Sequence, residues 1–348
     1  MIELSNCILS TVSAHLVGNK TTTEEMHLSK EPLDISDQKL RELLVRFFLT
    51  NFKSPEFFSF TFSNDDIDLN PVYNYVSEIF DNEKSLHAQS VNLAKHLFET
   101  SVHPNIKSGD FFVAYFPTLI INHEQHEAIG LFKSENKDSF LKLISTSKKY
   151  EMTYDNGINI DKLDKGCLIL NIQKESGFKV CIFDKSNKSS EAQYWRENFL
   201  NLTPCADNYH HTKNFLTLTK NFVTDKLNQD FETTKADQID LLNRSIDYFK
   251  KHEQFEENEF TQEIFKQNDV IESFKQYKND FQDERSIEIA DDFEISSPAL
   301  KKQSRIYKSV LKLDKNFHIY IHGNREMIEK GMDSNGRKFY KIYYNEEE

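Results

Sequence analysis

The stretch from Ser189 to Leu227 limits the folds open to this chain, because it separates a strand-rich front half from a hydrophilic helical segment. It holds the single tryptophan, Trp195, and the pair Ser190 and Gln193 predicts a capping box at a helix start. Apolar residues at helical spacing extend this helix up to Pro204, and a second amphipathic helix follows it. Two such helices must bury their apolar stripes, so we expect them to pack on the preceding strands.

The front half predicts an α+β fold, since its strands cluster instead of alternating strictly with helices. An early strand is expected over Asn6–Val17, and helices are expected after Ser36, from Pro71 and over Ser85–Thr100. The region Lys174–Gly177 is typical of a hairpin connection. We therefore expect an antiparallel sheet of about five strands, flanked by helices. Its strands are expected at Asp110–Phe116, Glu127–Lys133, Ser139–Ser147, Gly166–Gln173 and Phe178–Asp184.

The charges of the chain are unevenly placed. The 348 residues carry a net charge of −13. From Asp225 to Ser297, 20 acidic residues stand against 9 basic ones, a balance of −11, whereas from Pro298 to Asn345, 11 basic residues stand against 4 acidic ones, a balance of +7. Because single cores usually stop growing near about 250–300 residues, we expect three regions. These are an α+β sheet domain at 1–188, a helical region at 189–297 that is acidic from 225, and a basic C-terminal β module at 298–348.

The composition indicates a globular chain with no membrane contact. Hydrophobic residues make up 38% and aromatic residues 13% of the sequence, which is enough for a packed core. The sequence has no basic leader followed by an apolar run, and no run of about 18 apolar residues. Its four cysteines form no C-x-x-C pair, so we expect them to be reduced core residues.

The basic C-terminal module is the best candidate for a nucleic-acid-binding face. A turn at Asp333–Gly336 precedes a last strand over Lys338–Tyr344, and Ala299–Tyr307 is expected as a basic helix or an extended arm. Lysine and arginine contacts to phosphates give salt-sensitive affinity that is largely independent of base sequence. The alternative is an ordinary charged β surface. The residues expected to contact nucleic acid are Lys301, Lys302, Arg305, Lys308, Lys312, Lys315, Arg325, Arg337, Lys338 and Lys341.

The acidic segment admits three interpretations. Ile239, Leu242, Ile246 and Phe249 recur at helical spacing and predict one of its helices. The acidic residues form a solvated helical face, a docking surface for a basic protein, or a surface that shields the basic module within the same chain. The sequence leaves these alternatives open.

Several motifs resemble catalytic or metal sites but lack the spacing that the chemistry needs. His123 and His126 are three apart in an expected loop, whereas the metalloprotease helix needs two histidines four apart. His210 and His211 are adjacent at a helix start, where capping is the better interpretation. Neither a glycine-rich phosphate loop nor a G-x-S-x-G elbow occurs. We therefore predict no enzymatic activity, no catalytic residue, no metal site and no cofactor.

A pattern of aromatic and polar residues runs through the central stretch, namely Tyr194, Trp195, Phe199, Leu200, Pro204, Asp207, Asn208, Tyr209, Thr212, Phe222 and Val223. This pattern resembles the bacterial nucleoid-associated protein family, the NdpA-like group. The resemblance extends from an N-terminal ILSTVSAHLVG strand, over nearly the whole chain, to the C-terminal basic β element. It implies a cytoplasmic protein found with the bacterial chromosome, and it carries no defined active site to transfer.

Two hypotheses for the function follow, with a third behind them. In the first, the chain is a non-enzymatic nucleoid-associated protein that binds DNA through its basic tail, largely without sequence specificity. In the second, it is an interaction module that reaches the nucleoid through a protein partner bound to its acidic helices. The third is an anti-phage defence effector, which would require Mg²⁺-dependent cleavage. A homodimer is an open alternative to a monomer.

Overall fold

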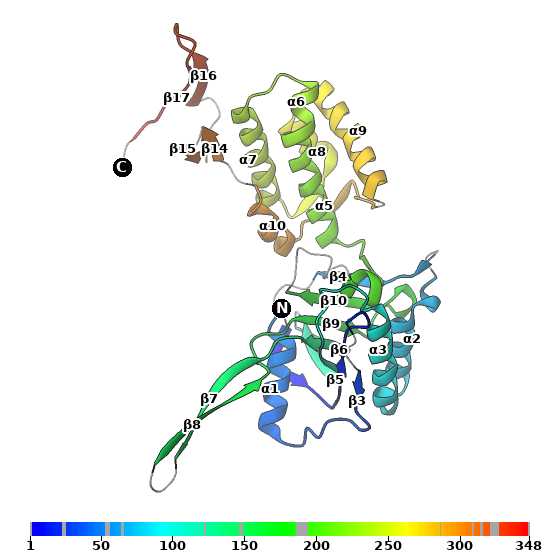
Figure 1. The fold of residues 1–348 in the computed structure, drawn as a ribbon. Coiled ribbons are helices and arrows are strands. Elements are labelled where there is room, and N and C mark those ends of the chain that lie inside the picture. Colours follow the sequence, from blue (N-terminus) through cyan, green and yellow to red (C-terminus); the bar gives the residue numbers. More distant parts are fainter. Residues whose placement is uncertain are drawn as a thin grey trace. The chain divides into compact units, whose positions relative to one another are not determined.

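The chain forms two compact units, Met1–Cys205 and Ala206–Glu348 (Figure 1). Antiparallel strands and helices together confirm the predicted α+β class. The predicted division into three regions, with boundaries after residues 188 and 297, stays a prediction. The computed structural model describes residues 2–22, 26–52, 56–63, 66–121, 123–145, 149–185, 194–285, 287–307, 310–313, 316–320 and 327–346.

A large antiparallel sheet is the centre of the first unit. Its strands are β1 (Ile2–Ile8), β2 (Thr11–Val17), β3 (His27–Leu28), β4 (Phe57–Phe60), β5 (Gly109–Ile121), β6 (Glu124–Ser134), β9 (Lys165–Leu170), β10 (Lys179–Asp184) and β11 (Leu202–Pro204). They run in the order β11-β4-β10-β9-β6-β5-β2-β3, and β1 pairs with β5. The early strand predicted over Asn6–Val17 is therefore two strands, and both of them pair with β5.

Helices cover both faces of this sheet, which explains why strand β5 is apolar without interruption from Phe111 to Phe116. Along β5, Phe111 faces one core and Phe112 faces the other, as the two-residue repeat of a strand requires. Helices α2 (Pro71–Asp81) and α3 (Leu86–Thr100) pack on the first face. Helix α1 (Gln38–Leu49) packs on the second face (Figure 1).

The helix starts follow from local hydrogen bonding. Helix α1 begins after Asp37, whose carboxylate accepts the backbone N–H of Leu40, one residue later than the cap predicted at Ser36. Helix α2 begins at Pro71 as predicted, because a proline at the first helical position has no N–H to satisfy. The side chain of Asn70 caps this helix.

The tryptophan segment differs from its prediction. Tyr194–Phe199 forms a short π-helix, and Leu202–Pro204 then pairs with β4 as strand β11. The prediction of one helix up to the proline is wrong, because Asn201 adopts a φ of 53° that no right-handed helix contains. The predicted capping residues Ser190 and Gln193 lie outside the described residues.

Two buried lysines lie beneath this segment. Lys133 of β6 and Lys165 of β9 are register partners, and their side chains are 0% and 2% exposed. Glu135 lies 3.1 Å from the Lys133 ammonium group, and Asp184 lies 3.1 Å from that of Lys165. The Tyr194 ring is 5.8 Å from the first ammonium group and 5.4 Å from the second. Both charges are thus paired inside the fold, as burial requires.

A separate hairpin, which we call the arm, consists of β7 (Asp138–Ser145) and β8 (Tyr150–Gly157). It extends away from the sheet of its own unit (Figure 1). The strand predicted over Ser139–Ser147 exists as β7, but it pairs with β8 and not with the main sheet. Strand β8 was not predicted, although Tyr150, Met152 and Tyr154 alternate with polar residues along it.

The second unit begins as a helical bundle around phenylalanine rings. The ring of Phe215 lies 4.2 Å from that of Phe255 and 5.1 Å from that of Phe260, centroid to centroid. The elements are α5 (Asn208–Asn221), a π-helix (Phe222–Lys226), α6 (Leu227–Asp230), α7 (Lys235–Lys251), β12 (Gln254–Glu256), α8 (Glu257–Ile264), α9 (Asn268–Arg285), β13 (Asp292–Glu294) and α10 (Ser297–Ser304). No helix within the described ranges has both the length and the apolar character needed to cross a membrane.

The tail forms two small hairpins. Strand β14 (Val310–Leu313) pairs with β15 (Phe317–Tyr320), and β16 (Ile328–Met332) pairs with β17 (Lys338–Ile342). The predicted turn between the last two strands is present, with Gly336 at a φ of 79° that only glycine adopts freely. Ile328 packs on Ile239 of α7 and fixes the second hairpin to the bundle.

Candidate functional site

Helix α10 presents basic side chains from its C-terminal end. Ala299 and Gln303, four residues apart, are buried and define the inner side of the helix. The ammonium group of Lys302 lies 3.4 Å from the hydroxyl of Tyr209 and 6.0 Å from its ring centroid. Three of the predicted residues are exposed on or just after the helix, namely Lys301, Lys302 and Arg305.

Hairpin β16–β17 divides its basic residues between two faces. The register pairs Met332 with Lys338, and alternation along β16 puts Lys330 on the same face as this pair. Lys341 belongs to the opposite face, because it differs from Lys338 by an odd number of positions. Arg337 lies just before β17, and its side chain is held by Asp333 of the turn. The tail residues predicted as one surface are therefore not all on one side of this hairpin.

Arg337 and Lys341 have acidic partners. Nε of Arg337 donates to Oδ2 of Asp333 at 2.9 Å, and Nζ of Lys341 lies 4.0 Å from Oε2 of Glu329. The backbone N–H of Arg337 lowers the pKa of Asp333, and a hydrogen bond with Tyr343 raises the pKa of Lys341. Part of the positive charge of these two residues is compensated locally.

The face with Lys330 and Lys338 carries uncompensated charge. Both side chains are exposed, and neither has an ion-pair partner in the part of the chain that the structure describes. Sequence reasoning missed Lys330, because strand β16 was not predicted; its pairing with β17 is the signal that places it. Of the other predicted residues, Lys312 lies in β14, while Lys308, Lys315 and Arg325 lie outside the described residues.

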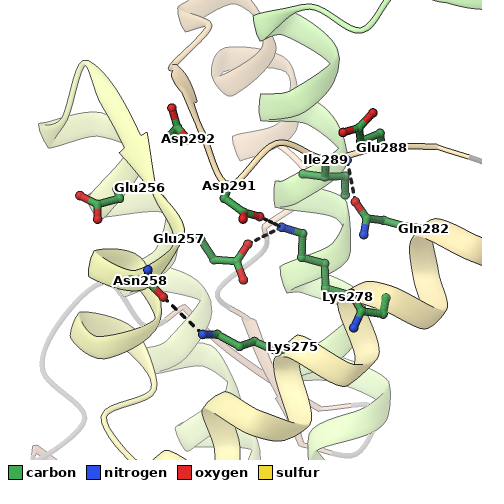
Figure 2. A pocket seen from close by; sticks show the side chains of 11 residues that line it. Glu256, Glu257, Asn258, Lys275, Lys278, Gln282, Glu288, Ile289, Asp291 and Asp292 are labelled. Carbon is green, nitrogen blue, oxygen red and sulfur yellow. Dashed lines mark hydrogen bonds and ion pairs between the residues drawn. The ribbon is translucent and has the colours of Figure 1, made fainter.

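An acidic pocket lies in the helical part of the second unit (Figure 2). Lys278 of α9 is buried there, and its ammonium group contacts the carboxylates of Glu257 and, at 2.6 Å, of Asp291. The hydrogen bond from Lys278 lowers the pKa of Asp291. Since a buried charge is tolerated only when it is paired, Lys278 is a structural link between α8, α9 and the chain before β13.

The remaining lining of this pocket leaves acidic groups open to solvent. The cavity has a volume of about 530 Å³. Lys275 is held by Asn258, whose side-chain oxygen is 3.3 Å from the ammonium group (Figure 2). Glu256, Glu288 and Asp292 are exposed at the pocket, and within the described ranges none of them has an ion-pair partner. The pocket can accept a cationic group.

The histidine pair at the start of α5 has structural partners. The backbone N–H and Nδ1 of His210 both lie 3.0 Å from Oδ1 of Asp207, which caps the helix. Nδ1 of His211 accepts the backbone N–H of Ala290, and its ring stacks on Phe293 with centroids 5.6 Å apart. Burial lowers the pKa of His211. Over the residues that the structure describes, no group of three His, Cys, Asp or Glu side chains is arranged to hold a metal ion.

Comparison with known proteins identifies the family. A search of curated proteins gives no significant match. A family model described as nucleoid-associated protein YejK matches residues 13–337, most of the chain and parts of both units. The match confirms the resemblance drawn from the residues between Tyr194 and Val223, and it places the protein in the cytoplasm with the nucleoid. The chain belongs to the family of the nucleoid-associated protein YejK.

Proposed function

We propose that the chain binds duplex DNA through its basic tail, largely without sequence specificity and without catalysing a reaction. The observation that carries the proposal is the uncompensated face with Lys330 and Lys338, to which the exposed side of α10 adds Lys301, Lys302 and Arg305. Ammonium and guanidinium groups of this kind bind phosphates, which are the same at every base pair.

The weak sequence preference follows from the residue types. Specific readout in the major groove depends mostly on side chains that contact a base in a bidentate manner, above all arginine on guanine. The guanidinium group of Arg337 is instead engaged by Asp333. Lys330 and Lys338 are flexible point charges, which suit phosphate contacts better than base contacts.

The net charge of −13 does not oppose this proposal. Exposed charges are screened over about 10 Å at 0.1 M salt, so a bound phosphate responds mainly to the tail residues near it. The acidic segment Asp225–Ser297 then lowers the long-range attraction and limits binding to close contact.

Duplex-DNA binding over a salt series tests the proposal with two matched variants of one hairpin. The first variant changes Lys330→Gln and Lys338→Gln on the uncompensated face, and the second changes Arg337→Gln and Lys341→Gln, whose charges are partly compensated. The slope of log affinity against log salt is negative, and each lost phosphate contact makes it shallower by about 0.9. We expect the slope to become shallower by about 2 in the first variant. In the second variant, the slope should change less. Equal slopes in the wild type and both variants would exclude the tail hairpin as a DNA contact.

A non-catalytic role is tested on plasmid DNA. We expect supercoiled plasmid to remain intact after long incubation with the protein and Mg²⁺. Nicking or linearisation that requires the protein would instead support the nuclease or defence alternative.

The acidic pocket favours a second candidate function, a protein partner with a basic segment. Its exposed carboxylates and its cavity of about 530 Å³ suit lysine or arginine side chains. We compare Glu256→Gln, Glu288→Gln and Asp292→Asn together with a control that changes Asp283→Asn and Glu284→Gln, which do not line the pocket. Loss of nucleoid localisation by fluorescence microscopy in the first variant alone, with DNA affinity in solution unchanged, would favour recruitment through a partner.

A further inference from the structure

The arm has one face made of uncharged side chains. Paired residues in an antiparallel hairpin point to the same face. The register pairs Leu141 with Tyr154, Leu143 with Met152 and Ser145 with Tyr150, so these six side chains share a face. Its centre is the pair of Leu143 and Met152. Between the strand bounds that the structure describes, no acidic or basic residue interrupts it.

This face is open to solvent along its whole length. The exposed fractions are Leu141 72%, Leu143 62%, Tyr150 72%, Met152 66% and Tyr154 73%. Together these side chains expose on the order of 700 Å², more than the largest apolar patch of most monomers. Contiguous apolar patches of this size mark places where another macromolecule binds.

The opposite face of the arm is suited to water. The register places Phe140, Lys142 and Ile144 on this face together with their polar partners Asp155, Thr153 and Glu151. Lys142 and Asp155 form an ion pair of 2.6 Å across the strands, and the Lys142 ammonium group lies 5.5 Å from the Phe140 ring centroid. Thr153, the register partner of Lys142, is exposed on the same face. Phe140 and Ile144 on this face are 46% and 47% exposed, less than each of the five side chains on the apolar face.

The base of the arm is fixed to the first unit. The carboxylate of Asp138 accepts hydrogen bonds from Asn159 at 2.8 Å and from Lys162 at 2.7 Å, and the bond from Lys162 lowers the pKa of Asp138. Ser139 and Asn156, the second register pair of the hairpin, are linked by a side-chain hydrogen bond of 2.7 Å. The arm is thus held in an extended form that presents its apolar face.

We propose that a second copy of this chain docks on the apolar face of the arm. A face without charge does not complement DNA or a charged peptide, but a uniformly apolar face complements itself. Two copies related by a twofold axis would bring the same residues together, with Leu143 and Met152 at the centre. Stacked sheets lie about 10 Å apart and interdigitate their side chains.

The exposed area agrees with what such a dimer needs. A standard stable interface buries about 800 Å² on each partner, and the five apolar side chains alone expose on the order of 700 Å². An isolated two-stranded hairpin is at best marginally stable in water. Stacking two arms makes a four-stranded, two-layered structure with a dry centre.

Two neighbouring residues of β8 provide a matched test. Met152 and Thr153 are both exposed but lie on opposite faces of the arm. We compare Met152→Glu and Thr153→Glu with the wild type by sedimentation velocity from submicromolar to 100 µM protein, at about 0.15 M salt, where exposed charges are screened beyond about 8 Å. We expect dimers for the wild type and Thr153→Glu, and a dissociation constant at least tenfold higher for Met152→Glu.

A second measurement shows that the loss is specific to the arm. Because Met152 is exposed, the substitution should leave the unfolding transition seen by Trp195 fluorescence unchanged, and Met152→Leu should restore the dimer. Hydrogen exchange of β7 and β8 amides should slow when the wild type is concentrated. A wild type that stays monomeric over the whole range, or equal effects of the two glutamates, overturns the proposal. Weaker DNA binding by Met152→Glu with no change in mass also overturns it and assigns the face to DNA.

Discussion

The sheet of the first unit and the tail of the second unit use lysine in opposite ways. Lys133 and Lys165 face each other across two central strands, with side chains 0% and 2% exposed, and each is paired with a carboxylate. Lys330 and Lys338 also share a face of two paired strands, but they are exposed and unpaired among the described residues. The same side chain therefore serves the fold in one place and is available to a ligand in the other.

This difference teaches that burial, more than the count of basic residues, identifies a binding surface. A buried lysine has exchanged its water for protein groups and has no free charge to offer. An exposed lysine without a partner keeps its full interaction with a phosphate. Exposed lysines with partners, such as Lys341 beside Glu329, lie between these limits.

The largest expected effect comes from Lys133→Met. The change leaves the carboxylate of Glu135, whose side chain is 9% exposed, without its ion-pair partner, which costs about 3–5 kcal/mol of unfolding free energy. Urea unfolding followed by Trp195 fluorescence reports on the first unit, because this is the single tryptophan. The control is Lys174→Met, whose partner Asp81 is 68% exposed and whose loss costs about 1 kcal/mol or less. Equal losses of unfolding free energy in the two variants would show that the buried ion pair stabilises the fold no more than the exposed one.

The next effect concerns the protonation of His15 in the same unit. Burial, with a smaller contribution from His87, lowers the pKa of His15 to about 4. Nδ1 accepts the backbone N–H of Ser29 and Nε2 lies 2.8 Å from Oγ of Ser90, so the folded state holds the neutral ring. The unfolded state binds a proton near pH 6.5. The stability that the neutral ring of His15 contributes is fully present above about pH 6.5, and it is lost as the pH falls toward 4.

The expected loss between pH 7 and pH 4.5 is on the order of 2 kcal/mol, measured as unfolding free energy from Trp195 fluorescence. The variant His15→Gln should show a pH dependence that is shallower by this amount. The exposed residue His27 provides the control, since His27→Gln should behave as the wild type does. Parallel curves for all three proteins would contradict the assignment to His15.

A smaller change in free energy, but a direct change in binding, is expected for Lys338→Gln. The exposed side chain makes no ion pair within the described ranges, so unfolding free energy should change by less than about 0.5 kcal/mol. The salt slope of DNA binding should fall by about 1. The matched change Lys30→Gln, at an exposed lysine of the first unit that also makes no ion pair within the described ranges, should leave this slope unchanged. A slope lowered equally by both changes would argue for general charge effects.

The smallest effect is expected for Arg337→Gln. Because Asp333 already neutralises part of its charge, the salt slope should fall by less than it does in Lys338→Gln. The comparison sharpens when Asp333→Asn is added: this variant should bind DNA more tightly, since it releases Arg337. Weaker binding by Asp333→Asn would show that the turn, and not the free charge, is what the DNA needs.

The sequence predicted those parts of the fold whose signals are local. Pro71 marks the start of α2, and the glycine at the end of Lys174–Gly177 has a φ of 87° in the connection between β9 and β10. Non-local pairing was not predictable in the same way. Strand β11 forms because Leu202 pairs with Phe60, which lies far away in the sequence. The loop expected around His123 to His126 is mostly strand, because Glu124 already belongs to β6.

The candidate site was predicted by composition but not by geometry. The excess of basic residues after Pro298 is visible in the sequence, whereas their division between faces depends on strand register. Lys330 was missed for that reason. The apolar face of the arm was missed as well, because Met152 and Tyr154 meet Leu143 and Leu141 only when β7 and β8 pair. Whether these surfaces bind DNA and a second copy stays a prediction for the experiments above.

The position of β4 in the sheet has a consequence for synthesis. This strand lies between β10 and β11, and both of these partners are translated long after it. At about 5–20 residues per second, Phe58 and Phe60 wait unpaired on the ribosome for on the order of 10 s. During that interval the nascent chain exposes an apolar strand with two open edges. The first unit is complete only after Pro204 has emerged, so its folding must follow the synthesis of nearly all its residues.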